Sequence, residues 1–97
     1  MRTVPYPTPG EILLHEFLGP MGVTQDDLAQ AIGVPLHHIA QIVAGETGVT
    51  ASVGLRLSRY FGTSDAYWSG LQASYELAKA REELAEALAD IKPLARL

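Results

Sequence analysis

The segment from Thr24 to Gly45 constrains the fold more than any other part of the chain, because it carries start and stop signals for two short helices. Thr24 is a favourable N-cap, and Asp27 three positions later completes a pair that resembles a capping box. Apolar residues then follow at the spacing of one helical face, namely Leu28, Ala29 and Ile32. Gly33 supplies the left-handed conformation that commonly ends a helix. The segment therefore predicts a first short helix that stops at Gly33.

A second short helix is predicted directly after this turn. Pro35 lies where its fixed φ helps a helix to begin, and Gly45 closes the segment. The buried face of this helix would consist of Ile39, Ile42 and Val43. Two short helices joined by a glycine turn are typical of a helix-turn-helix, which presents its second helix to a DNA major groove. The same pattern also fits an αα-hairpin that has no role in DNA binding.

The charge of this region is unusual for a DNA-binding segment. Residues 3–55 contain no Lys or Arg but five acidic residues, a formal charge of −5 within a chain whose net charge is −4. Nonspecific affinity for DNA comes largely from Lys and Arg side chains that displace counterions. The sequence therefore disfavours a protein that coats nucleic acid without sequence preference. A local DNA site would depend instead on hydroxyl groups and on backbone N–H groups at helix N-termini.

The predicted DNA-contacting residues lie on the outer side of the second helix and near helix N-termini. They are Thr24, Gln25, Pro35, Leu36, His37, His38, Gln41, Thr47 and Thr50. Gln41 carries an amide that can bond adenine bidentately. His37 and His38 would add positive charge below neutral pH, so we predict that DNA affinity rises as the pH falls from about 8 to about 6. The alternative is that both histidines simply face solvent.

The first part of the chain predicts an arm followed by a helix. Residues 1–8 contain two prolines and should form an extended N-terminal arm. The sequence Thr8-Pro9-Gly10-Glu11 is a capping box with proline at the first helical position. It predicts a helix from Pro9 to about Leu18, which the glycines and proline of residues 19–22 should break.

The second part of the chain predicts two further helices. Thr50 should cap a helix over residues 51–61, and Ser64 should cap a longer helix that reaches about Asp90, with Gly70 as its weak point. No strand-like alternation is present, so the fold class is all-α. Three regions are expected: an arm at 1–8, a helix-turn-helix domain at 9–78 and a C-terminal helical extension at 79–97.

The predicted last helix carries an apolar stripe. Leu77, Leu84 and Ile91 are spaced seven apart, and the residues between them are largely charged. This stripe would fold back on its own domain, or pair with a second chain or a partner protein. Aromatic residues earlier in the helix fit either the core or a dimer contact. The predicted dimer interface comprises Tyr67, Trp68, Leu71, Tyr75, Leu77 and Leu84.

Composition and motifs exclude several classes of function. The chain has no Cys, and therefore no disulfide, thiolate nucleophile or cysteine-based zinc site. It also lacks a glycine-rich phosphate loop and a suggestive Ser-His-acid set, so we expect neither an enzyme nor a cofactor or metal site. The apolar run Ile12-Leu13-Leu14 is too short for a signal peptide or a membrane span, and we expect a soluble, cytoplasmic protein with no membrane partner.

Several motifs in this order resemble the HigA (VapI-type) antitoxin family of Cro/repressor-like helix-turn-helix proteins. The matching segments are Pro9-Gly10-Glu11-Ile12-Leu13, Leu28-Ala29, Ile32 to Pro35, Leu55 to Ser64 (LRLSRYFGTS) and Tyr67 to Leu77 (YW..LQ..YEL). The resemblance covers about residues 9–78. It implies a compact five-helix bundle that dimerises and represses its own operon at an inverted repeat in double-stranded DNA. It also implies a partner toxin, a RelE/HigB-like ribonuclease encoded beside the antitoxin, which the protein binds and silences.

The chain departs from the family where DNA contact is expected. His37-His38 stands where the family commonly has Arg or another strong donor, and Glu46-Thr47 stands where Lys or Arg is common. Loss of these cations would weaken DNA binding and flatten its salt dependence. Two alternatives therefore stay open. One is a protein-interaction module whose acidic surface meets a basic partner and whose operator binding is weakened or lost. The other is an orphan transcriptional regulator without a toxin.

Overall fold

The computed structural model describes residues 6–95, and within them every regular element is a helix. The elements are α1 (Pro9–Ile12), the π-helical turn η1 (Leu13–Leu18), α2 (Gly19–Met21), α3 (Gln25–Ile32), α4 (Leu36–Val43), α5 (Ala51–Phe61), α6 (Tyr67–Glu83) and α7 (Ala85–Asp90). Because α1, η1 and α2 follow one another directly, they act as one helical segment. With α3 to α6 this segment makes a five-helix bundle, which confirms the all-α prediction.

Threonine caps start three of the helices where the sequence predicted them. The Thr8 hydroxyl accepts the Glu11 N–H at 3.1 Å while the Glu11 carboxylate accepts the Thr8 N–H at 2.8 Å, a complete capping box. Thr24 caps α3 and Thr50 caps α5 by the same i+3 bond. These bonds satisfy N–H groups that a helix start leaves unpaired, so each start is determined locally.

The first helical segment extends further than the sequence indicated. It does not break at Gly19, because η1 inserts a π-helical turn in which the Gly19 N–H donates to the carbonyl of Leu14, five residues back. A proline in an ordinary helix lacks a donor and clashes with the preceding turn, whereas a π-turn shifts the register locally. Pro20 therefore fits at the start of α2, and the segment ends only at Gly22, whose φ is +66°.

The last helix differs from prediction at both ends. Ser64 does not cap it; α6 begins at Tyr67 behind a turn in which the Tyr67 N–H donates to the Ser64 carbonyl at 3.1 Å. Gly70 lies inside an unbroken α6, and the break falls at Leu84, with φ −103° and ψ 10°. All residues of α7 are exposed. Because helices gain most of their stability from packing, a helix that has left the bundle is easily interrupted.

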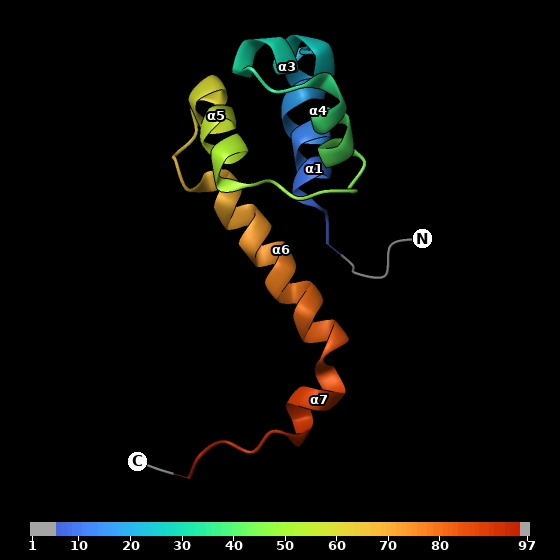
Figure 1. Ribbon diagram of the computed structural model, residues 1–97, viewed down its shortest axis with the longest axis vertical. Helices are drawn as coiled ribbons and strands as arrows, with labels where there is room; N and C mark the ends of the chain where they lie inside the picture. Colours follow the sequence, from blue (N-terminus) through green and yellow to red (C-terminus); the bar gives the residue numbers. More distant parts are fainter. Residues whose placement is uncertain (1–5, 96–97) are drawn as a thin grey trace.

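The core lies between the first helical segment and α3 to α6. Its fully enclosed large side chains are Leu13, Leu28, Ile39, Ile42, Leu57 and Trp68. The Trp68 ring packs against Phe17, with ring centroids 5.0 Å apart, and Phe17 also contacts Phe61 at 4.9 Å. Figure 1 shows the consequence for shape: the start of α6 is held in the bundle, and the rest leads away with α7 at its far end. The principal extents are 53 × 33 × 22 Å.

The helix α1 lies unusually close to α4. A Cβ atom placed on Gly10 would lie 1.8 Å from the carbonyl oxygen of Ile42 and 2.6 Å from its carbonyl carbon. Only glycine permits this approach, because both obstructing atoms belong to the backbone. The contact therefore sets the position of α4, the second helix of the helix-turn-helix, on the bundle.

Candidate nucleic-acid interface

The outward face of α4 consists largely of the residues that the sequence indicated. Ile39 and Ile42 are fully buried and hold the helix on the core, whereas Leu36, His37 and Gln41 are exposed. His38 is half-buried, so the two adjacent histidines do not share one surface. The exposed strip combines one apolar side chain, one imidazole and one amide. These groups can contact a thymine methyl, a base edge and an adenine respectively.

Helix N-termini near this strip offer further hydrogen-bond donors. Pro35 is the N-cap residue of α4, but its side chain accepts no hydrogen bond from the start of the helix. The first N–H groups of that helix, on Leu36 and His37, therefore have no intrahelical partner and favour an anion. Thr24 and Thr50 are exposed, and each hydroxyl oxygen already accepts a cap bond at 3.0 or 3.3 Å. A hydroxyl that accepts one bond still has its own proton to donate to a phosphate.

The two arginines of α5 do not supply the missing cations to this strip. The Arg56 guanidinium donates to the carbonyl of Ile32 at 2.6 Å, where α3 ends. Cations and donors stabilise the C-terminal end of a helix, so Arg56 acts as a cap of the helix-turn-helix turn. Arg59 is exposed and borders, with Arg56 and Tyr60, a shallow hollow beside Ala31 and Ile32.

The loop between α4 and α5 holds a contact that sequence reasoning missed. Val49 is buried, and its N–H donates to the side-chain oxygen of Gln72 on α6 at 2.8 Å. Thr47 and Glu46 on the same loop are exposed, as the sequence suggested. The two bonded residues are 23 positions apart. The only signal for Gln72 in the sequence was its place in the LQ..YEL motif.

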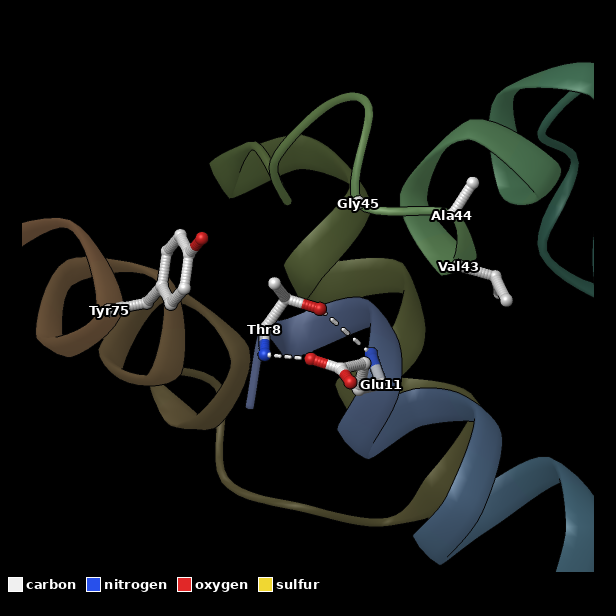
Figure 2. Close-up of a pocket in the computed structure, with 6 residues that line it drawn as sticks. All are labelled: Thr8, Glu11, Val43, Ala44, Gly45 and Tyr75. Atoms are coloured by element: carbon white, nitrogen blue, oxygen red, sulfur yellow. Dashed lines mark hydrogen bonds between the residues drawn. The ribbon is translucent and has the colours of Figure 1, made fainter. Parts of the chain in front are cut away.

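The cavity drawn in Figure 2 does not have the features of a catalytic or metal site. It measures about 520 Å³ and is lined by Thr8, Glu11, Val43, Ala44, Gly45 and Tyr75. Its polar groups include the capping box of Thr8 and Glu11, whose two bonds are visible in the figure. Within residues 6–95, no group of three or more His, Asp or Glu side chains is placed to hold a metal ion.

The N-terminal arm is anchored beside this cavity where the structure describes it. Of the predicted arm, residues 1–5 lie outside the described residues. The Tyr6 ring packs edge-on against Tyr75, with centroids 5.5 Å apart. Desolvation raises the pKa of the Tyr6 hydroxyl, and Glu82, Tyr75 and Glu83 raise it further. Residue 6 is therefore attached to α6 rather than extended into solvent.

The predicted dimer residues fall on two different sides of α6. Trp68 is completely buried in its own chain, so assigning it to a dimer contact was wrong: Phe17 and Phe61 cover its ring. Tyr67, Leu71 and Tyr75 are half-buried on the same inner side. Leu77 and Leu84, by contrast, are 54% and 49% exposed. The stripe does not fold back on the domain, since Leu88 and Ile91 are also exposed.

Comparisons with known proteins agree with this geometry. The Helix-turn-helix family matches residues 14–68. Virulence-associated protein I of Dichelobacter nodosus is 43% identical over 75 residues, which cover 77% of this chain and 69% of that protein. Antitoxin HigA-1 of Vibrio cholerae is 34% identical over 85 residues, 88% of this chain and 80% of that protein. The solved structure of Pseudomonas aeruginosa antitoxin HigA with higBA promoter has a TM-score of 0.86 and 37% identity, covering 91% of this chain and 97% of that one.

These relatives are antitoxins, regulators and virulence-associated proteins, and none of their names describes an enzyme. Within residues 6–95, no helix has both the length and the apolar character needed to cross a membrane. The match to the Helix-turn-helix family runs from η1 to the start of α6. The chain therefore belongs to the helix-turn-helix family, and within it to the HigA-type antitoxins.

Proposed function

We propose that this protein is the antitoxin of a type II toxin–antitoxin module, a dimeric DNA-binding repressor of its own operon. The observation that carries the proposal is the exposed strip of Leu36, His37 and Gln41 on α4. That strip lies on a backbone closely similar to a Pseudomonas antitoxin solved with its promoter. A protein that acts on chromosomal DNA works in the cytoplasm of a bacterial cell, and we assign it there.

The DNA contacts we propose are mostly uncharged. Gln41 reads a base edge, and the first N–H groups of α4 behind Pro35 bind a phosphate. The other proposed contacts are Thr24, Gln25, Leu36, His37, His38, Thr47 and Thr50. Residues 3–55 contain no Lys or Arg, so few counterions are released on binding. The affinity of this protein for its operator should therefore depend weakly on salt.

The dimer contact we propose uses the outer side of α6. Gly70, Ala73 and Leu77 are exposed, and at 100° per residue they lie within about 60° of one another on α6. Ala66 and Leu84, also exposed, lie at the two ends of the helix. Small residues beside two leucines allow a second helix to approach closely. An isologous contact along this side of α6 places two copies of α4, the recognition helix, on opposite halves of an inverted repeat. The domain at 9–78 would bind DNA, and residues 79–97 would extend the dimer contact.

The toxin we propose is a RelE/HigB-like ribonuclease encoded beside this chain. The excess of acidic residues in the bundle favours encounter with a basic partner. The same excess supports the second candidate function, an interaction module that binds a basic protein and has lost its operator. An orphan regulator is the third candidate, and the presence of an adjacent reading frame for a small basic protein separates it from the other two.

The test is fluorescence anisotropy of the purified protein on DNA from upstream of its own gene, with scrambled DNA as competitor. At about 50 mM salt, selective binding that is lost in Gln41→Ala supports the repressor. Gln30 provides a matched control, because Gln30→Ala removes the same kind of side chain from an exposed position on α3 that is not among the proposed contacts. Absence of selective binding, together with tight binding of the adjacent toxin, would favour the interaction module.

A further inference from the structure

Gln72 connects the long helix α6 to the loop that follows the recognition helix. Its side-chain oxygen accepts the Val49 N–H at 2.8 Å, and its side-chain nitrogen donates to the Glu76 carboxylate at 2.9 Å. Glu76 lies one turn further along α6, so it determines which end of the amide faces the loop. With the nitrogen held by a carboxylate, the oxygen is presented to Val49.

The loop fits closely around this amide. A Cβ atom on Gly48 would lie 2.7 to 2.8 Å from three atoms of the Gln72 side chain, so glycine lets the loop lie directly on the amide. Val49 is 5% exposed and places its side chain in the core. Together these contacts hold the middle of the loop against α6, and Thr47 and Thr50 on either side face outward.

The loop has few other constraints beyond its two ends. Its first residues are tied to α4 by the Glu46 N–H, which donates to the Gln41 carbonyl at 2.9 Å. Its last residue, Thr50, caps α5 through the Val53 N–H. Between these ends, the bond from Val49 to Gln72 is the one hydrogen bond that the described structure gives to a distant element. The position of Thr47 relative to α4 therefore depends on Gln72 together with the buried side chain of Val49.

We infer that Gln72 is a positioning residue for DNA binding. Through the Val49 N–H it holds the loop so that Thr47, Thr50 and the N-terminus of α5 meet phosphates while α4 lies in the groove. This inference rests on the proposed function, because it needs an operator. It adds a role for a residue that touches no DNA, and it links the loop to the same helix that carries the proposed dimer contact.

Three variants test the inference. Gln72→Met keeps the length and removes the acceptor. Gln72→Glu keeps an acceptor for Val49 but sets two carboxylates side by side. The double variant Q72E/E76Q exchanges the two groups. The carboxylate at position 72 then accepts from the Val49 N–H and from the side-chain amide at position 76. The double variant also has the same net charge as the wild type, which makes it the matched control for the two single changes.

We expect Q72M and Q72E to weaken operator binding roughly ten-fold, as loss of one positioned contact per subunit would. The slope of log Kd against log salt should stay unchanged, because no cation lies on this loop. Hydrogen exchange at the Val49 N–H should become faster, and the double variant should restore both affinity and protection. Dimer affinity, measured by sedimentation, should be the same in all four proteins.

The outcomes separate this inference from the function on which it rests. If the wild type binds its operator and Q72M binds equally well, the inference is overturned and the repressor function stands. If Q72M weakens dimerisation to the same extent as DNA binding, Gln72 acts on the fold and the inference is also overturned. If the wild type shows no selective DNA binding, the proposed function fails first, and exchange at Val49 still reports whether the bond exists.

Discussion

Replacing Gly10 with alanine should displace the recognition helix α4. The added Cβ would lie 1.8 Å from the Ile42 carbonyl oxygen and 3.0 Å from the Val43 Cα. Both atoms belong to the α4 backbone, so no side chain can rotate away to relieve the overlap. Real Cβ atoms stay at least 3.0 Å from such atoms, and therefore the Cβ must move at least about 1.2 Å (from 1.8 to 3.0 Å) from the oxygen.

The cost of this movement follows from what α4 carries. Overpacking a core usually costs about 1–3 kcal/mol. Moving α4 outward also loosens the packing of Ile39 and Ile42, which are both fully buried. In the opposite direction, alanine stabilises a helix by about 0.5–1 kcal/mol relative to glycine. Because the clash is with backbone atoms, we expect an overpacking cost near the upper end of its range and a net loss of about 2 kcal/mol in the free energy of unfolding. For a chain of this size that corresponds to a fall of roughly 8–16 °C in Tm.

Circular dichroism during heating and in urea would measure this loss, and Gln30→Ala provides the control. Gln30 is exposed on α3 and its amide bonds Asp26 in the same helix, so its truncation should change the free energy of unfolding by less than about 0.5 kcal/mol. A clear loss in Gly10→Ala beside an unchanged control would support the reasoning. A Gly10→Ala variant with a Tm and a DNA affinity equal to the wild type would refute it.

Two further predictions concern the helix cap and the dimer. Arg56→Met should lower the free energy of unfolding by about 1 kcal/mol through loss of the Ile32 bond, whereas Arg59→Met should change it by less than about 0.5 kcal/mol in the same urea titration. Leu77→Glu should shift sedimentation toward the monomer with unchanged circular dichroism, and an unchanged dimer would count against the outer side of α6 as the dimer contact.

Local signals predicted much of the fold correctly. The starts of α1, α3 and α5 each depend on a threonine hydroxyl and an N–H three residues later, so both partners are visible within four letters of sequence. The turn at Gly33 is equally local, since its φ of +70° needs only the absence of a side chain. Burial of Ile39 and Ile42 followed from helical spacing.

The candidate site was predicted only in part, because periodicity does not say which side of a helix is covered. The sequence placed Trp68 and Leu77 together in one dimer interface, yet the first is enclosed by its own domain and the second is exposed. Leu84 interrupts a helix that its composition would continue. Both differences arise where α6 leaves the bundle, and no short-range pattern marks that point.

The sequence by itself determined the starts of α1, α3 and α5, their threonine caps and the exposed strip of α4, because these depend on residues within about one or two helical turns. It also determined the absence of Lys and Arg from residues 3–55. Only the tertiary structure decided that Gln72 reaches Val49 across 23 residues and that Gly10 must be small to meet Ile42. It also decided that half of α6 stands free. These features depend on how helices distant in sequence pack, and packing is decided by the whole core rather than by any one segment.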